Sequence, residues 1–550
     1  MKSALAQVLH LSGSMTKYLL IVLSMLAALG CSSSDNGSGS TGVSVQPPPL
    51  DRLIEEGDIV WLDGSTLYVL NQSKGLSVIG IGDPSAPTLM SRASLSGTPV
   101  EMYLHNGYIL ALNSGISSAS SSTTSSRMTV IDVRKPGSPL LAGYVGLSGT
   151  TTNSRLVCDV LYTASDSGAV IESVNVANPG SPQLVDRITL PLGTSGSNVL
   201  ATENVFYVAT ESYQGTAMGE CASSYYDNEG CTTIFAIDIS SPVGVLRFGA
   251  NYAMAGMLKD RWGMDAYGGV FRVLVARDGW WTSTGSLTAT LRTFNSPDAS
   301  HLDPIATLSL DTAHLEKVMA VRFDGPRAYL VTYRQADPLF TIDLSDPANP
   351  TIAGYLQTPG WLDFIIPRGN RLLGIGRDWN SQSAGWHLQA SIYDVSNLGS
   401  PRLMDRIPFG DSYSALPDQA DNLAKVVRTV DDLSLLLVPY NSTSTGYSQD
   451  NTGGRVEIVS YANDTLGTFG QIAAASEIVR AVPLPPNHIA VVTEPAVGVV
   501  QLTPSLEVSG VVDLNQSLAG TPTKPDAGSP VDGGSQPGDA GSPVDGGFHD

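Results

Sequence analysis

Short apolar runs of strand length, separated by polar turns, recur along most of the chain. In one stretch the run Tyr329–Val331 is followed by the mostly apolar run Leu339–Leu344 and then by Thr351–Leu356. Each run is rich in β-branched or aromatic residues, which favours strands over helices. The turn Ser345–Pro350 separates the last two runs, and its prolines cannot donate hydrogen bonds to a strand ladder. The pattern predicts adjacent strands joined by a fixed bend.

The same proline turn returns along the chain roughly every 50 residues. The first proline of each clear copy is Pro84, Pro136, Pro179, Pro242, Pro297 or Pro347. Weaker copies follow near residues 398–401, 461–464 and 500–504. Aspartates precede several copies, at Asp132, Asp238, Asp343 and Asp394. A ring of carboxylates is one interpretation, but their place in the turn favours bracing of the turn backbone.

A strand, a tight turn and a second strand precede the proline turns. Examples are Asp58–Leu70, Met102–Leu112, Lys317–Val331 with Asp324-Gly325 at its turn, and Ile365–Ile375. An Asp-Gly pair is a strong hairpin signal. One module therefore has four strands, a to d, with a tight a–b turn, a variable b–c loop and the proline turn between c and d. Such repeats are typical of β-propeller blades. We expect an all-β chain with a single β-propeller of eight or nine modules over residues 51–516.

The first 30 residues predict an export signal. Tyr18–Leu29 is an almost wholly apolar run, too short to span a bilayer but suited to a signal peptide. The small residues before Cys31 resemble a bacterial lipobox, and the resemblance implies cleavage before Cys31 and a diacylglycerol on its sulfur. The alternative is an ordinary secretory signal. Whether Met1 or Met15 is the start stays open.

Two low-complexity segments flank the expected propeller. Residues 31–50 are rich in Ser and Gly and end in prolines, which predicts a flexible tether. Residues 517–550 repeat Asp526–Gly534 identically at Asp539–Gly547 and offer little to bury, so this tail is expected to be disordered. A calcium-binding or wall-contacting tract is the alternative.

Charge and motif content restrict the function. The formal net charge is −21 and no basic cluster exists, which excludes nucleic acid and leaves a lipid anchor as the expected contact with a membrane. The seven histidines are scattered, and the repeats contain no HExxH motif, nucleophile elbow or phosphate-binding glycine loop. We therefore expect no catalysis, no cofactor and no metal. Propeller enzymes can gather ligands from several blades around the channel, so a channel metal site stays an alternative.

The four cysteines predict one disulfide. Cys221 and Cys231 flank a single short loop, and in an exported chain with few cysteines such a pair indicates a bridge. Metal binding by this pair is less favoured, because no histidine is near. Cys158 lies in an apolar run and is expected to be a buried free thiol.

Five predicted b–c loops are long, namely 114–127, 212–232, 278–286, 378–386 and 441–454. Because strands alternate in direction, all b–c loops emerge on one face, and insertions on one face of a repeat array often mark a binding surface. Aromatic residues in these loops are the candidate binding residues: Trp280, Trp281, Trp379, Trp386, Tyr225 and Tyr226. The alternative is that surface loops simply vary in length.

Four segments, Glu55–Leu70, Asp260–Gly269, Val321–Asp346 and Leu372–Arg377, resemble the secreted bacterial β-propeller domain proteins, which are distantly related to WD repeats. The resemblance implies an exported propeller and no particular activity. We expect a non-catalytic lipoprotein of the outer membrane or cell surface that binds or scaffolds an envelope protein or polysaccharide. The alternatives are an enzyme with a channel metal site and a purely structural surface protein. The oligomeric state and the side of the outer membrane stay open.

Overall fold

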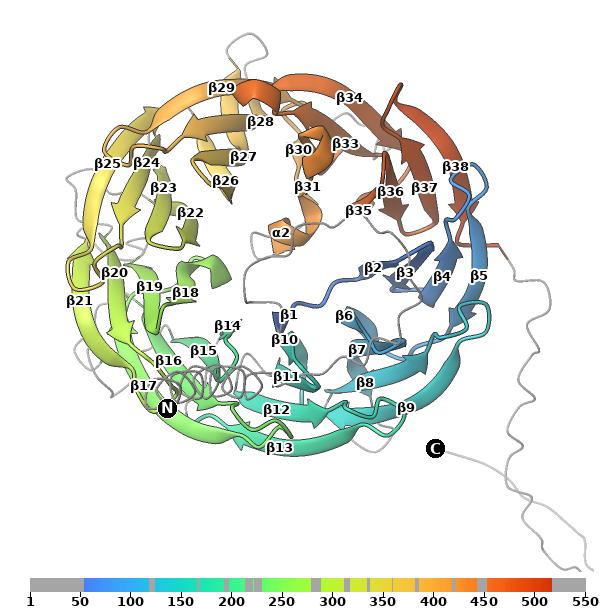
Figure 1. Cartoon of the computed structure of the whole chain (residues 1–550), viewed down its shortest axis with the longest axis horizontal. Helices are drawn as coiled ribbons and strands as arrows, with labels where there is room; N and C mark the ends of the chain where they lie inside the picture. Colours follow the sequence, from blue (N-terminus) through green and yellow to red (C-terminus); the bar gives the residue numbers. More distant parts are fainter. Residues whose placement is uncertain are drawn as a thin grey trace, which may run out of the picture. The chain divides into compact units, whose positions relative to one another are not determined.

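Nine antiparallel sheets form a ring around a central channel in the computed structural model (Figure 1). The described residues are 54–117, 124–165, 169–191, 197–212, 221, 230–277, 288–310, 317–333, 337–358, 360–380, 385–417, 422–442 and 453–516. They belong to a compact unit of residues 1–515, apart from Gln516 of the second unit. The expected signal, tether and tail lie outside the described residues.

Each sheet is one blade, and its strands follow the chain from the channel outward. Blade 1 has β2 (Val60–Asp63), β3 (Thr66–Asn71), β4 (Gly75–Gly80) and β5 (Thr88–Ala93); blade 2 has β6 (Thr98–His105), β7 (Tyr108–Ser117), β8 (Thr124–Asp132) and β9 (Leu140–Leu147). Blade 3 has β10 (Thr151–Val157), β11 (Val160–Ser165), β12 (Val170–Asn175) and β13 (Gln183–Thr189). Blade 4 has β14 (Ser197–Ala201), β15 (Val205–Ser212), β16 (Cys231–Asp238) and β17 (Arg247–Ala255).

The remaining blades repeat this order. Blade 5 has β18 (Met264–Tyr267), β19 (Val270–Arg277), β20 (Thr288–Asn295) and β21 (Asp303–Ser309); blade 6 has β22 (Lys317–Asp324), β23 (Arg327–Tyr333), β24 (Asp337–Asp343) and β25 (Thr351–Thr358). Blade 7 has β26 (Trp361–Arg368), β27 (Arg371–Asn380), β28 (Gly385–Asp394) and β29 (Arg402–Phe409). Blade 9 has β35 (Ile478–Leu484), β36 (His488–Thr493), β37 (Ala496–Gln501) and β38 (Glu507–Asp513).

Blade 8 departs from the pattern at its innermost strand. The short strands β30 (Ser414–Ala415) and β31 (Arg428–Val430) both pair with β32 (Leu435–Ser442), and the helix α2 (Leu423–Val426) lies between them. The outer strands β33 (Gly453–Ser460) and β34 (Gly467–Ala474) complete the sheet. The irregular module expected here is therefore a complete blade, and of the two expected numbers the propeller has nine.

The proline turns carry two recurrent hydrogen bonds. Within a turn, the aspartate that ends strand c accepts a hydrogen bond from the backbone N–H two residues later, as Asp343 does from Ser345 at 2.9 Å. The equivalent bonds of Asp132, Asp238 and Asp394 are 3.1, 2.9 and 3.0 Å. These carboxylates brace turns and form no ring. Between blades, the Thr341 hydroxyl donates to the Leu398 carbonyl in the next proline turn at 2.5 Å, and Thr293 donates likewise to Pro347 at 2.7 Å.

Apolar side chains fill the interfaces between successive blades. One cluster joins Leu330 and Ile342 of blade 6 to Leu291 of blade 5, and comparable clusters lie at the other interfaces from blade 1 to blade 9. Blades 9 and 1 share no strand in the described sheets. Their contact includes a hydrogen bond from the Asn71 amide to the Glu494 carbonyl at 2.8 Å. No helix among the described residues is long and apolar enough to cross a bilayer.

Candidate functional site

The first described residues enter the central channel before the chain starts blade 1. β1 (Ile54–Glu55) comes just before blade 1 in the sequence, but it pairs with β10 and forms an extra inner strand of blade 3 (Figure 1). Asp58 then forms an antiparallel bridge with Met102 of blade 2. Between these two anchoring points, Gly57 packs against Glu101, and a Cβ on Gly57 would lie only 2.7 Å from the Glu101 side chain. The channel is therefore partly filled by the chain itself.

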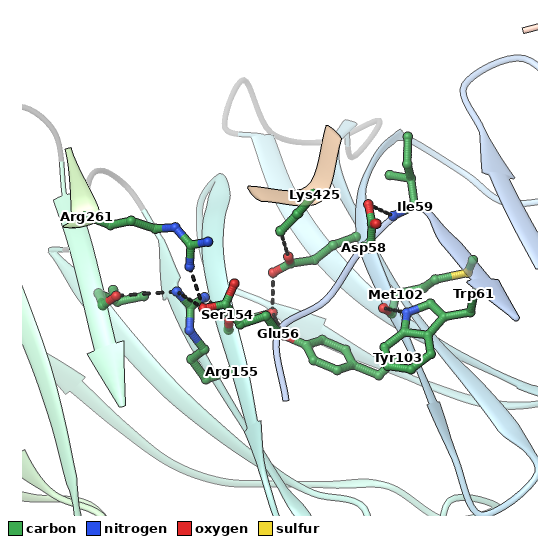
Figure 2. A network of polar contacts seen from close by, with 12 residues as sticks. Glu56, Asp58, Ile59, Trp61, Met102, Tyr103, Ser154, Arg155, Arg261 and Lys425 are labelled. Atoms are coloured by element: carbon green, nitrogen blue, oxygen red, sulfur yellow. Dashed lines mark hydrogen bonds and ion pairs between the residues drawn. The ribbon is translucent and has the colours of Figure 1, made fainter. Parts of the chain in front are cut away.

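Two arginines neutralise Glu56 in the channel. Its carboxylate lies 3.4 Å from Arg155 on β10 and 2.5 Å from Arg261, which belongs to the 3-10 turn Arg261–Gly263 before blade 5 (Figure 2). Burial by itself would raise the pKa of Glu56, but the two guanidinium groups outweigh this effect and lower the pKa to about 2. Glu56 is therefore ionised at neutral pH and links blades 3 and 5 through the channel.

Asp58 is paired with cations from two further blades. Its carboxylate lies 3.0 Å from Arg480 on β35 and 2.5 Å from Arg428 on β31, while its side chain is only 9% exposed. The neighbouring Glu101 is buried, accepts a 2.5 Å hydrogen bond from Ser154 and lies 3.1 Å from Lys425 on α2 (Figure 2). Asp58 and Glu101 thereby connect blades 8 and 9 to blades 2 and 3.

The channel carboxylates just described are all paired with cations. Glu56, Asp58 and Glu101 each lie within ion-pair distance of Arg or Lys. Across the part of the chain that the structure describes, no three His, Cys, Asp or Glu side chains come together as a group able to hold a metal. The geometry of this half of the channel fits a structural clamp.

The other half of the channel contains an arginine without a carboxylate partner. Arg322 on β22 is 9% exposed, and among the described residues it forms no ion pair. Its guanidinium carbon lies 3.4 Å from the centroid of the Trp262 ring and 4.9 Å from that of Phe364. A cavity of about 590 Å³ opens beside these side chains. Two further cavities, of about 630 and 230 Å³, lie next to Glu56 and Asp58 respectively.

Two of the predicted binding tryptophans lie on strands of blade 7. The prediction that Trp379 and Trp386 belong to a loop is wrong, because β27 and β28 extend to Asn380 and Gly385 and place the two residues directly opposite one another. Their ring centroids are 5.5 Å apart, and Trp361 at the start of β26 lies 4.6 Å from Trp386. The three indoles form a cluster, here called the blade 7 tryptophan cluster, on the b–c face.

Two glycines allow Trp361 to approach the neighbouring strand. Gly360 has a φ of 79°, and a Cβ there would lie 2.1 Å from the Arg377 carbonyl oxygen. A Cβ on Gly376 would lie 1.8 Å from the carbonyl oxygen of Trp361 itself. The register then shifts between Leu362 and Phe364, a local irregularity of the kind that re-aims side chains. Sequence inspection had a usable signal here, because Gly376 lies inside the strand β27, where a glycine often marks a close backbone approach.

Polar groups surround the blade 7 tryptophan cluster. The Trp361 indole N–H donates to Asp363 at 3.0 Å, and burial raises the pKa of Asp363 despite this hydrogen bond. Asp378 lies 3.1 Å from Arg406. Trp379 is half exposed, at 50%, so one indole remains accessible to a partner. The other predicted binding residues, Trp280, Trp281, Tyr225 and Tyr226, and the lipidation candidate Cys31 lie outside the described residues.

The cysteines follow the prediction only in part. Cys221 and Cys231 form a disulfide in the structure, with Cα atoms 5.8 Å apart. The prediction that Cys158 is a buried free thiol in a strand is wrong. Val157 of β10 pairs directly with Val160 of β11, so Cys158 lies in the tight turn between the two strands, with a φ of 53°. Cys158 is also disulfide-bonded and therefore is not a free thiol.

Nine four-stranded blades around a channel define a β-propeller. A family model described as the β-propeller domain matches residues 51–183 and 165–482. The chain therefore belongs to this β-propeller domain family, as the sequence resemblance implied.

Two archaeal proteins of uncharacterised function are similar over part of the chain. A protein of Methanocaldococcus jannaschii is 34% identical over 154 residues, which is 28% of this chain and 23% of that protein. A protein of Archaeoglobus fulgidus is 32% identical over 155 residues, which is 28% of this chain and 22% of that protein. The match thus spans less than a quarter of either relative.

Solved structures with a similar course of the chain include Sqt1 of Saccharomyces cerevisiae, at 9% identity and a TM-score of 0.39, covering 73% of this chain and 90% of that one. A protein from Lactobacillus plantarum is 12% identical with a TM-score of 0.34, covering 64% of this chain and 95% of that one.

Proposed function

We propose that this propeller is a non-catalytic binding module of the cell envelope and that the blade 7 tryptophan cluster is its binding surface. The observation that carries the proposal is the convergence of Trp361, Trp379 and Trp386 within 4.6 to 5.5 Å at the b–c edge of one blade. Tryptophan provides a large amphipathic contact area at little cost in conformational entropy. A non-catalytic role is supported by the pairing of the channel carboxylates with cations.

The chemistry around the cluster favours a neutral glycan as the partner. A sugar ring has an apolar C–H face that stacks on an indole and a rim of hydroxyl groups that need hydrogen bonds. Asp378 and Arg406 offer such groups within the same blade. The net charge of −21 would repel a strongly acidic polymer, so a neutral envelope polysaccharide fits best. A protein partner is the other outcome that the experiment distinguishes.

Co-sedimentation with insoluble, protease-treated envelope polysaccharide tests this proposal. Trp379→Ala is expected to weaken binding about tenfold or more, as truncation of an interface tryptophan does. Tyr355→Ala is the matched control, because Tyr355 is an exposed aromatic residue, at 65%, on the outermost strand of blade 6. Equal losses in both variants would show that the wrong surface is chosen, and binding only to untreated envelopes would indicate a protein partner.

We also propose that Cys31 anchors the mature chain to the outer membrane or cell surface through a lipid. The lipobox-like residues before Cys31 and the tether after it support this proposal. Cys31→Ala is expected to move the protein from the membrane fraction to the soluble fraction. Since one sulfur cannot carry both a thioether and a disulfide, recovery of a disulfide-linked Cys31 peptide from membrane-extracted protein would contradict the anchor.

A further inference from the structure

The cavity beside Arg322 combines an apolar wall with a buried cation. It has a volume of about 590 Å³, within the range of small-molecule sites. Trp262, Phe364, Ile366, Pro367 and Val427 contribute apolar surface, and they come from blades 5, 7 and 8. The cavity lies at the a–b turn end of the channel, since Asp324 and Pro367 near the a–b turns of blades 6 and 7 line it. It is therefore separate from the blade 7 tryptophan cluster on the b–c face.

Arg322 has hydrogen-bonding capacity that the described residues do not use. Its Nε donates to the Ile365 carbonyl oxygen at 3.0 Å, which is one of five N–H groups on a guanidinium. Burial lowers the pKa of Arg322 to about 9, and repulsion from Arg261 acts in the same direction, while Asp260 and Glu56 oppose this shift. The side chain therefore still carries its charge at neutral pH. Asp260 and Glu56 attract the guanidinium from a distance, but neither forms an ion pair with it in the described chain. An anion that reaches the unused N–H groups therefore gains a charge-assisted interaction.

Trp262 supplies a second donor at the same site. Its indole nitrogen is buried and has no hydrogen-bond partner among the described residues. The centroid of the same ring lies 3.4 Å from the Arg322 guanidinium carbon. The indole N–H of Trp262 and the unused N–H groups of Arg322 are therefore close together. Buried donors without partners are rare in folded proteins and call for an explanation such as a missing ligand.

We propose that this cavity binds a small monocarboxylate with an apolar body, with Arg322 and Trp262 holding the carboxylate. The planar guanidinium matches the two oxygens of a carboxylate, and the apolar walls accept a hydrocarbon chain or ring. The other charged residues that line the cavity favour a ligand with one negative charge over a ligand with two. Arg428 at the cavity edge is neutralised by Asp58 at 2.5 Å, and Asp324 at the rim would repel a dianion. The site is independent of the proposed glycan surface.

Calorimetric titration of the purified mature chain with octanoate tests the proposal. Saturable binding at a single site is expected, and octan-1-ol and octyl phosphate serve as the neutral and dianionic probes. Arg322→Gln should weaken octanoate binding roughly ten- to hundredfold, as loss of a charge-assisted hydrogen bond does. Arg322→Lys keeps the charge but not the planar fork, so its affinity should be intermediate. Trp262→Phe keeps an aromatic ring and removes only the N–H donor, with a loss of about fivefold expected.

Controls separate the site from a general effect on the protein. Arg247→Gln removes an arginine that is 63% exposed on β17 and should leave octanoate binding unchanged. Circular dichroism of each variant establishes that it is folded. No saturable binding by the wild-type chain, or unchanged affinity in Arg322→Gln, would overturn the proposal. Tighter binding of octan-1-ol or octyl phosphate than of octanoate would overturn the assignment of the ligand class.

Discussion

The central channel has a paired half, in which buried arginines form ion pairs with carboxylates, and an unpaired half, in which Arg322 forms none in the described chain. On one side, Arg480 and Arg428 are paired with Asp58, and Arg155 and Arg261 with Glu56. Arg322, by contrast, stacks on Phe364 and on the Trp262 ring, and it forms no ion pair in the described chain. Arg261 lies over the same Trp262 ring, 4.0 Å from its centroid, so the two environments adjoin. Both Arg480 and Arg322 project from innermost strands and are less than one-tenth exposed.

The difference lies in the origin of the negative charge. The carboxylates that pair with these four arginines come from residues 56–58, which lie in the channel before blade 1 begins. Breaking a buried ion pair by removing one partner is costly, because the remaining charge stays desolvated. The paired half is thus suited to holding the ring together. The unpaired half leaves a charge and a cavity that a ligand can complete.

Removal of the Asp58 carboxylate should produce the largest change in stability. Asp58→Asn keeps the shape of the side chain but leaves Arg428 and Arg480 without their shared counter-charge. We expect the free energy of unfolding to fall by roughly 3–5 kcal/mol, measured by urea denaturation. Asp63→Asn on the exposed end of β2 is the control and should change little. Similar stability of the two variants would show that the N-terminal segment does not clamp the channel.

A smaller effect is expected where the segment passes Glu101. In Gly57→Ala the added Cβ would lie 2.7 Å from the Glu101 side chain, which has to shift away from Ser154 or Lys425. Overpacking of this kind costs about 1–3 kcal/mol. Gly146→Ala provides the comparison, because its Cβ would meet nothing within 4 Å. If both substitutions are equally mild, residues 54–58 do not pack in the channel as described.

The weakest expected effect concerns Glu56, whose side chain is 40% exposed to solvent. Its pKa falls from an ordinary 4.5 to about 2 in the folded state, so its stabilising contribution is fully present above pH 4.5 and disappears as the pH falls toward 2. The melting temperature of Glu56→Gln should lie below that of the wild type at pH 6, and the difference should vanish near pH 2. A difference that stays constant with pH would argue against the ion pairs with Arg155 and Arg261.

Local signals in the sequence predicted the blades well. Proline turns and Asp-Gly turns depend on neighbouring residues, and within the blades they mark strand boundaries. Asp343 and its counterparts brace turns because their N–H partners lie only two residues away. Blade 8 was ambiguous for the same reason, because the weak turn copy at 461–464 contains no proline and forms a 3-10 turn between β33 and β34. In addition, α2 interrupts its innermost strand.

The channel was not predictable in this way. Glu56 and Arg261 are 205 residues apart, and no local pattern distinguishes Glu56 from an acidic residue on a surface. Arg322 and Trp262 likewise meet only through the ring. The error at Trp379 and Trp386 has a different origin, because the β27–β28 hairpin extends further than a typical strand and so includes both residues.

The most direct test of the two halves compares Arg480→Gln with Arg322→Gln in the same chain. For each variant, urea denaturation gives the free energy of unfolding and calorimetry gives the affinity for octanoate. We predict that Arg480→Gln is clearly the more destabilising, because it deprives the buried Asp58 of a partner, while only Arg322→Gln loses octanoate binding. Equal destabilisation by both substitutions, or octanoate binding that depends on Arg480 and not on Arg322, would contradict this division of the channel.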